Sequence, residues 1–250
     1  MKAIVLAAGR GERMRPLTDD LPKPMLVVRG KPLIEWHLEA LARDGVREVV
    51  INAAWLEQKI VAMLGNGSRF GLAIHYSLEG RDHGGALDTA GGIVKALPLL
   101  RGADDAADGD CFWVISGDLF VPGFRFDAAR AQRFVGGTGE AHVWLVPNPP
   151  YHPKGDFGLD AGGRALADGT GPDGLRYAYA NIALIRESLF RGIRPGSRAA
   201  LGPLLFDAMR ERRVTAEVYR GAWHNVGTPE QLAALNGSAA SNDQTDSSSK

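Results

Sequence analysis

The first 120 residues alternate between short apolar runs and segments with helical spacing, and this alternation constrains the fold more than any other feature. Strands are expected at KAIVLAA (2–8), REVVINAA (47–54), LAIHYSLE (72–79) and CFWVISGD (111–118). Helices are expected between them at 32–45, 56–67 and 89–100. Such alternation implies a mostly parallel sheet with helices on both faces. The sequence therefore predicts a Rossmann-like, three-layer α/β/α fold.

After residue 120 the alternation loosens. Residues 155–185 combine short apolar stretches with glycine turns, a pattern typical of a small antiparallel insertion. The last helix is expected to begin with Thr228, Pro229 and Gln231, which form a capping box with proline in the first helical position. Residues 237–250 are polar and serine-rich, so we expect a disordered tail there.

The folded part is expected to be one domain over 1–236, with halves at 1–120 and 121–236. A chain of 250 residues, 45% of them hydrophobic, can bury the core of a single α/β domain. Lys plus Arg and Asp plus Glu number 29 each, so net charge gives no reason to expect nucleic acid or an anionic membrane as a partner. The opening MKAIVLAAGRG becomes charged too soon for a signal peptide. A cytoplasmic protein is therefore expected, and the single Cys111 excludes an intramolecular disulfide.

The loop after the first expected strand contains Gly9 and Gly11, which suggests a phosphate site. Backbone N–H groups at glycines can face an anion without interference from a Cβ. The loop does not match the dinucleotide fingerprint, because Met14 stands where the third glycine should be. It also lacks the Gly-Lys-Ser/Thr ending of the nucleoside triphosphatase loop.

Four cations follow the first glycine of this loop, and together they suit a ligand with several phosphates. They are Arg10, Arg13, Arg15 and Lys23. Prolines on both sides of Lys23 restrict its backbone and help to aim its ammonium group. An alternative interpretation is a solvated loop in which Asp19 and Asp20 pair with the arginines.

Asp118 stands just after an apolar strand, at the carboxyl edge of the predicted sheet, where open α/β folds bind ligands. Mg²⁺ prefers one or two carboxylates and takes its other ligands from phosphates and water. Asp118 is therefore a candidate Mg²⁺ ligand. The alternative is that its side chain caps the following turn.

These motifs resemble those of the sugar-1-phosphate nucleotidyltransferases. LAAGRGERMRPLTDDLPKPM (6–25) is similar to the signature loop of that family, SGDLF to its strand-end aspartate, and WHNVGTPEQL to its late metal-binding motif. NPPYHPKGDFGL and ALDTAGGI are most similar to the branch that uses UTP and N-acetylmuramate α-1-phosphate in cell-wall recycling. The resemblance covers residues 1 to about 235. It implies Mg²⁺-assisted transfer of a nucleotidyl group to a sugar 1-phosphate, with release of pyrophosphate.

The resemblance also implies roles for individual residues. Nucleotide contacts are implied for Leu6, Ala7, Ala8, Gly9, Gly11, Arg13 and Gly91. Sugar contacts, in the sugar-binding half, are implied for Asp156, Gly158 and Asn181. Catalytic roles are implied for Arg13, Lys23 and Asp118, with Lys23 reaching the sugar phosphate and the α-phosphate. Metal contacts are implied for Asp118 and Asn225, although Asn225 stands where the family usually has an aspartate, so a water could replace it as the ligand.

Other functions remain open at this point. The same chemistry could act on glucose 1-phosphate, mannose 1-phosphate or another sugar 1-phosphate, with thymidine or guanosine triphosphate as the donor. A non-catalytic sensor of sugar nucleotides is favoured by Asn225 and opposed by the intact Arg13, Lys23 and Asp118. A dehydrogenase is a third possibility, which a test of nicotinamide cofactor binding would decide. A monomer is expected, because only the tail follows residue 236.

Overall fold

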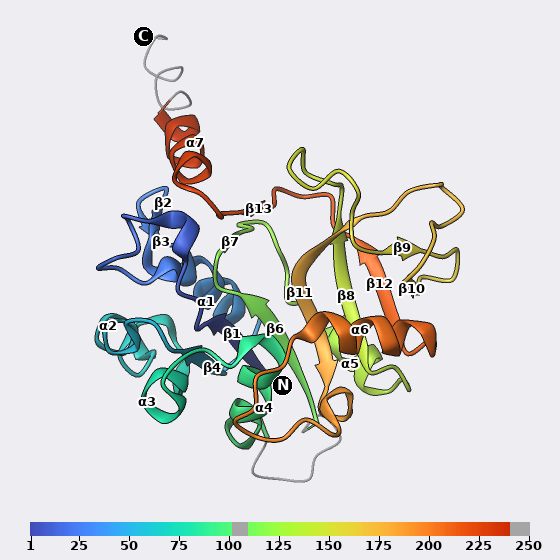
Figure 1. Cartoon of the computed structure of the whole chain (residues 1–250), viewed down its shortest axis with the longest axis horizontal. Helices are drawn as coiled ribbons and strands as arrows, with labels where there is room; N and C mark the ends of the chain where they lie inside the picture. The colour runs from blue at the N-terminus through green and yellow to red at the C-terminus, as the bar shows by residue number, and fades with distance from the viewer. Residues whose placement is uncertain (102–109, 241–250) are drawn as a thin grey trace.

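The computed structural model describes residues 1–101 and 110–240, and its centre is a seven-stranded sheet (Figure 1). The strand order in this described part is β12-β8-β11-β6-β1-β4-β5. The strands are β1 (Lys2–Ala7), β4 (Glu48–Ala53), β5 (Ala73–Leu78), β6 (Cys111–Ser116), β8 (Ala141–Val146), β11 (Ala178–Arg186) and β12 (Val214–Val218). The predicted three-layer α/β fold is confirmed.

The sheet is mostly parallel. β6, β1, β4 and β5 run parallel, and Val5 of β1 pairs with Ile51 on one side and Ile115 on the other. β11 is antiparallel to both of its neighbours, β6 and β8, whereas β12 is parallel to β8. The glycine-rich pattern at 155–185 predicted a small antiparallel insertion, but β11, at the end of this segment, lies inside the main sheet. Its apolar residues Ile182 and Leu184 are buried there.

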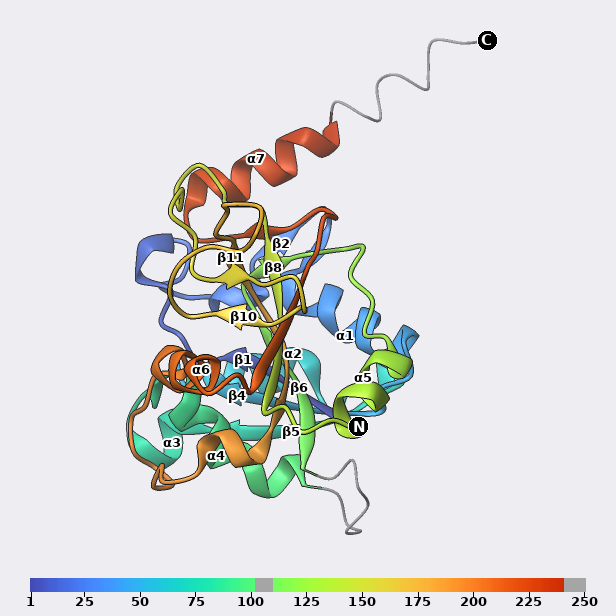
Figure 2. The same cartoon turned by 90° about the vertical axis from the view of Figure 1, so that its right-hand side faces the viewer.

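Helices cover both faces of the sheet (Figure 2). The helices on these faces are α1 (Leu33–Arg43), α2 (Glu57–Leu64), α3 (Glu79–His83), α4 (Asp88–Leu100), α5 (Ala128–Val135) and α6 (Leu201–Arg210). A further helix, α7 (Pro229–Ala240), projects from the molecule away from the sheet. Successive strand residues point to opposite faces, so Val5 packs with α1, α2 and α5 while Ile4 packs with α4 and α6. No helix of the described residues is both long and apolar enough to cross a membrane.

Short elements complete the described fold. Two-residue strands pair as β2 (Val27–Val28) with β3 (Lys31–Pro32), β7 (Leu119–Phe120) with β13 (His224–Asn225), and β9 (Gly158–Leu159) with β10 (Ala165–Leu166). The 3-10 helices are η1 (Glu12–Met14), η2 (Lys23–Met25), η3 (Ser68–Phe70) and η4 (Glu187–Phe190). The antiparallel β9–β10 pair is the small insertion that the glycine turns predicted.

The start of α7 has the predicted capping box. The Gln231 N–H donates to Thr228 Oγ1 at 3.3 Å, and the Thr228 N–H donates to Gln231 Oε1 at 3.1 Å. The expected disorder from residue 237 was wrong for residues 237–240, because α7 continues to Ala240. A capped start lets a helix propagate through residues of good helix propensity, and the alanines here outweigh Gly237. Residues 241–250 lie outside the described part.

Candidate active site

The loop after β1 is held together by its own charges. The Arg10 guanidinium lies 3.7 Å from the centre of the Trp55 ring and donates to Asp19 Oδ1 at 2.9 Å. Arg15 Nε donates to the same carboxylate oxygen at 2.7 Å. The hydrogen bond from Arg10, helped by Arg15, holds the pKa of Asp19 below its usual value. Two of the four cations of this loop therefore order the loop, as the alternative interpretation of Asp19 predicted.

Lys23 and Asp118 meet although they lie far apart in the sequence. Lys23 Nζ lies 2.5 Å from Asp118 Oδ2, and the Ser116 hydroxyl donates to Asp118 Oδ1 at 2.7 Å. Gly11 makes room for this arrangement. Its φ of +67° is left-handed, and a Cβ there would lie 3.1 Å from the Cβ of Lys23.

A first cavity of about 240 Å³ opens beside this ion pair, at the carboxyl ends of β1, β4 and β6. Its lining includes Leu6, Ala7, Ala8, Gly9, Lys23, Asn52, Asp88, Thr89 and Asp118. The structure thus brings together the first four predicted nucleotide residues and two of the three predicted catalytic ones.

Arg13 and Gly91 lie elsewhere. Arg13 is exposed, and its guanidinium lies 3.7 Å from where a Cβ on Gly227 would stand. Gly91 is buried in α4, where a Cβ would come within 2.3 Å of the Ser197 carbonyl oxygen. Glycine at this position is therefore required by packing of the helix against that loop. Contact of Arg13, Gly11 and Gly91 with a nucleotide stays a prediction.

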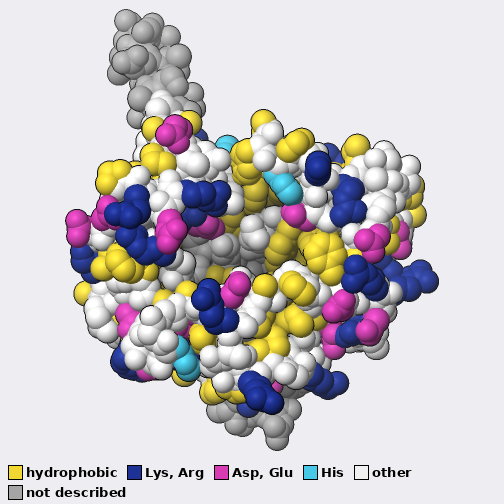
Figure 3. Space-filling model, viewed as in Figure 1, with side chains coloured by type: hydrophobic (Ala, Val, Ile, Leu, Met, Phe, Trp, Pro, Cys, Tyr) yellow, Lys and Arg dark blue, Asp and Glu magenta, His cyan; other side chains and the backbone are white. Residues whose placement is uncertain are grey.

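A second cavity of about 500 Å³ adjoins the first, and Asp88 and Thr89 line both. The rest of its wall comes from segments 149–157, 178–181, 200–206 and 223–225. Figure 3 shows that this face of the molecule is hollowed at its centre. The structure brings together Asp156, Asn181 and Asn225 in this wall, whereas Gly158 packs against the Gly169 carbonyl behind it.

Asn181 reaches this wall through an irregularity in β11. The pairing of β11 with β8 changes register between Tyr179 and Ala183, and Asn181 has a left-handed φ of +57°. Bulges re-aim side chains, and left-handed non-glycine residues concentrate at functional sites. Asp156 is held nearby, because its carboxylate accepts the Tyr179 N–H at 2.8 Å and lies 3.0 Å from His152 Nε2.

Asn225 is placed beside Asp118 by backbone pairing. It pairs with Leu119 across β13 and β7, and the next N–H, that of Val226, donates to the Asp118 carbonyl at 2.9 Å. Asn225 Oδ1 is buried without a hydrogen-bond partner in the described structure. A buried acceptor without a donor suits a bound cation or its water. No cluster of three or more His, Cys, Asp or Glu side chains suited to a metal occurs among the described residues.

Several lining residues were missed by sequence reasoning. Asn52 was a detectable signal, because it is a polar residue inside the apolar strand β4. Asp88 gave no such signal, because its left-handed φ of +64° is visible only in the structure. Trp223 also lines the second cavity, and it donates from Nε1 to the Ala180 carbonyl at 3.0 Å.

Comparisons with known proteins agree with this geometry. A family model described as nucleotidyl transferase matches residues 2–159. An N-acetylmuramate alpha-1-phosphate uridylyltransferase of Neisseria meningitidis serogroup B is 44% identical over 91% of this chain and 94% of its own length. The protein of the same description from Caulobacter vibrioides is 30% identical over 93% of this chain and 94% of its own.

The fold has a counterpart among solved structures. A Bacillus anthracis protein described as a glucose-1-phosphate thymidylyltransferase superposes with a TM-score of 0.77 at 21% identity. The match covers 96% of this chain and 95% of that one. At this identity the likeness establishes the shared fold.

Proposed function

The chain belongs to the nucleotidyl transferase family, and from this premise we propose that it transfers the uridylyl group of UTP to N-acetylmuramate α-1-phosphate and releases pyrophosphate. The observation that supports this most is the pair of adjoining cavities, which share Asp88 and Thr89. A reaction between two phosphorylated substrates needs two such sites side by side. This activity fits a role in cell-wall recycling.

The two cavities suit the two substrates. The first lies at the carboxyl ends of parallel strands, where α/β folds bind nucleotides, and has the Leu6–Gly9 segment as its floor. The second is about twice as large, at about 500 Å³ against 240 Å³. It is assigned to the sugar, because Asp156 and Asn181 in its wall offer polar groups that suit the hydroxyl and acetamido groups of N-acetylmuramate.

The chemistry needs positioning and charge rather than a general base. A phosphomonoester has a second pKa of about 6, so the attacking sugar phosphate is largely dianionic at neutral pH. One of its oxygens forms a bond to the α-phosphorus of UTP, and the bond from that phosphorus to the pyrophosphate oxygen breaks. Lys23 would leave Asp118 to contact the reacting phosphates, and Arg13 would stabilise the triphosphate. Preorganised contacts of this kind each contribute on the order of 3 kcal/mol in the transition state.

The residues beside Lys23 fit a magnesium ion. Asp118 supplies one carboxylate and Asn225 a buried amide oxygen that has no other described partner. Mg²⁺ accepts such a small protein ligand set when phosphates and water complete its shell. We propose that these two residues hold Mg²⁺, which neutralises charge on the phosphates when it is bound.

Pyrophosphate release over a panel of substrates tests the proposal. UTP, thymidine triphosphate and guanosine triphosphate are each combined with N-acetylmuramate α-1-phosphate, glucose 1-phosphate and mannose 1-phosphate. We expect UTP with the muramate substrate to give a kcat/KM at least about tenfold above every other pair, a ratio that pocket contacts can supply.

Lys23→Gln is the control that ties the signal to this site, because it keeps a polar, unbranched side chain but removes its charge. It should lower the rate at least about 100-fold. A higher kcat/KM with glucose 1-phosphate than with the muramate substrate would contradict the assigned sugar. No turnover with any pair would contradict the transfer reaction itself.

A further inference from the structure

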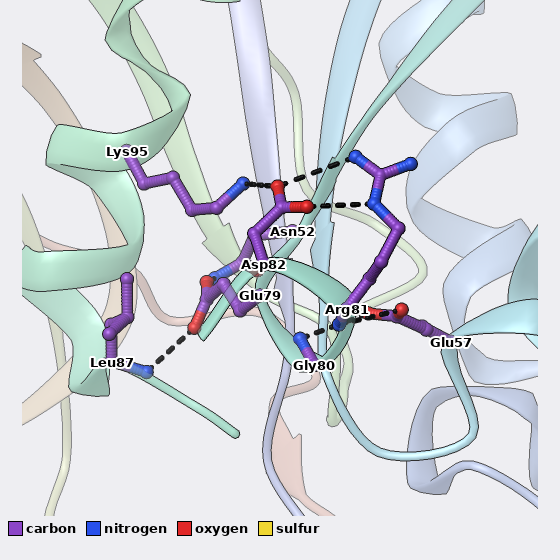
Figure 4. A network of polar contacts seen from close by, with 8 residues as sticks. All are labelled: Asn52, Glu57, Glu79, Gly80, Arg81, Asp82, Leu87 and Lys95. Atoms are coloured by element: carbon purple, nitrogen blue, oxygen red, sulfur yellow. Dashed lines mark hydrogen bonds and ion pairs between the residues drawn. The ribbon is translucent and has the colours of Figure 1, made fainter. Parts of the chain in front are cut away.

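A chain of buried hydrogen bonds runs beside the first cavity, and Figure 4 draws three of its members, Asn52, Glu79 and Leu87. The Ala7 N–H donates to Asn52 Oδ1 at 2.8 Å, and Asn52 Nδ2 donates to Glu79 Oε1 at 2.7 Å. The Leu87 N–H donates to Glu79 Oε2, also at 2.7 Å. Three bonds thus connect the end of β1, β4, α3 and the residue before α4. Glu79 is completely buried although it carries a carboxylate.

The direction of each hydrogen bond is fixed by its two ends. Both ends are backbone N–H groups, which can only donate. Asn52 accepts from the Ala7 N–H with its oxygen and donates to Glu79 with its nitrogen. Glu79 must therefore accept two hydrogen bonds, one from Asn52 and one from the Leu87 N–H. The carboxyl group of Glu79 does this with its two oxygens, whereas an amide cannot, because its nitrogen only donates.

Gly92 leaves the space that this pair occupies. A Cβ on Gly92 would lie 2.5 Å from Glu79 Oε1 and 2.6 Å from Asn52 Nδ2. Burial raises the pKa of Glu79, and the hydrogen bonds from Leu87 and Asn52 act in the opposite direction. A carboxyl group is therefore kept in a tight, buried place, which indicates that the position of its two oxygens is needed.

The chain ends where the two cavities meet. Ala7 and Asn52 line the first cavity, while Leu87 directly precedes Asp88 and Thr89, which line both. Leu87 is also held from the other side, because its carbonyl accepts the Ala199 N–H at 3.0 Å. The residues after Ala199 form part of the wall of the second cavity. Leu87 is thus fixed between the floor of one cavity and the wall of the other.

We propose that Asn52 and Glu79 are positioning residues for nucleotidyl transfer, which fix the Asp88–Thr89 segment relative to Ala7 and so hold the two substrates at reacting distance. This inference rests on the proposed function. Loss of the chain should act on the rate more than on binding, because a displacement of about 1 Å between reacting groups can lower a rate about 100-fold.

The same helix provides a matched control. Asp82 lies on the outer side of α3, where it accepts from Arg81 at 2.7 Å and from Lys95 at 2.7 Å (Figure 4). Its carboxylate is partly exposed and lines neither of the two cavities. Asp82→Asn therefore changes a carboxylate to an amide three residues from Glu79 without touching the buried chain.

The test is a double-mutant cycle. Glu79→Gln places an amide N–H against a donor at one end of the chain, whichever way the amide is turned. Adding Asn52→Asp restores the order, because the new carboxylate at position 52 accepts from both Ala7 and the amide at position 79. Asn52→Asp alone sets two carboxylates against each other. Each single variant thus breaks the chain of hydrogen bonds. The double variant rebuilds it, because it only exchanges the amide and the carboxylate between positions 52 and 79.

Each variant is assayed for pyrophosphate release with UTP and N-acetylmuramate α-1-phosphate, well below its own midpoint of thermal unfolding. We expect Glu79→Gln to lower kcat at least about tenfold while each KM stays within about threefold. The double variant should return to within about threefold of the wild-type kcat, and Asp82→Asn should match the wild type.

A wild-type kcat in Glu79→Gln overturns the inference, as does a double variant with no recovery. A rise in KM that accounts for the whole loss of activity overturns it too, because the chain then serves binding alone. If Glu79→Gln does not fold, the double variant decides the question alone, since it must fold and turn over. Absence of turnover in the wild type overturns the proposed function together with the inference, and so can be told apart from a failure of the inference alone.

Discussion

The two cavities are built in different ways, although they share a wall. The floor of the first is made by the ends of parallel strands, whose ladders fix Ala7 opposite Ala53 and Leu6 opposite Ser116. The wall of the second comes from loops and from the irregular part of β11, where Asn181 has a left-handed backbone.

This difference matches the two demands of the reaction. Activation of the α-phosphate is the same whatever sugar is used, and a regular sheet holds the groups for it with little freedom. Sugar choice depends on pocket shape, and loops can change shape without disturbing the sheet. The comparison therefore predicts large effects on turnover from the first cavity and selective effects on one substrate from the second.

The largest effect is expected at Asp118, which belongs to the first cavity. Asp118→Asn keeps the size of the side chain but removes the charge opposite Lys23 and the proposed Mg²⁺ ligand. Turnover should fall up to about 1000-fold, since one preorganised charge contact is worth up to about 4 kcal/mol in a transition state. Initial rates of pyrophosphate release measure this loss. A variant that keeps its cooperative thermal unfolding and also the wild-type rate would refute the catalytic role.

Acid should lower the stability of the fold through two buried histidines, one in each half of the chain. Burial lowers the pKa of His37, beneath β7, to about 4, and burial with the nearby Arg130 lowers that of His142, on β8, to about 4. The unfolded chain binds these protons near pH 6.5, so stability is full above that pH and falls as the pH drops toward 4. Together the two histidines should lower the free energy of unfolding by about 3 kcal/mol when the pH falls from 7.5 to 5.5.

Urea unfolding at both pH values measures this dependence. His37→Gln should remove about half of the difference between the two pH values, and His142→Gln the other half, whatever each does to stability at pH 7.5. An equal pH dependence in wild type and His37→Gln would mean that His37 does not titrate as its burial requires.

The first cavity was the more predictable of the two. Its floor and both ends of its ion pair come from short motifs in which neighbours in the sequence remain neighbours in space, as in Leu6–Gly9. The four arginine and lysine side chains of the loop, in contrast, looked equivalent in the sequence. Only the contacts of Arg10 and Arg15 with Asp19 show that these two hold the loop itself.

The second cavity could be predicted only in part, because its residues come from separate segments between 149 and 225. The residues next to Asn181 in the sequence do not predict its left-handed conformation, and those next to Trp223 do not predict that it lines a cavity. Long-range pairing decides such positions, as for Asn225, which β13 sets beside the end of β6. The end of α7 was missed because the polar composition at 237–240 was considered alone, without the capped start of the helix that precedes it.

A smaller and more selective effect is expected in the second cavity, at Asn181. Asn181→Gly removes the side chain but suits the left-handed backbone, so the fold should be retained. The KM for the sugar phosphate should rise about tenfold, the loss expected for one or two hydrogen bonds, while the KM for UTP stays the same. Steady-state kinetics with each substrate varied in turn measure both values. An equal rise in both KM values would break the distinction between the cavities.

The smallest effect is expected at Asn225, which lines the second cavity and lies beside Asp118 of the first. Asn225→Asp adds a charge to an oxygen that is buried without a described partner, and a charged ligand set binds Mg²⁺ more tightly than a neutral one. The Mg²⁺ concentration for half-maximal rate should fall about threefold, and Mn²⁺ binding followed by electron paramagnetic resonance should tighten in parallel. Asp118 alone would be the metal ligand if neither titration moved, and the second cavity would then contribute nothing to the metal site.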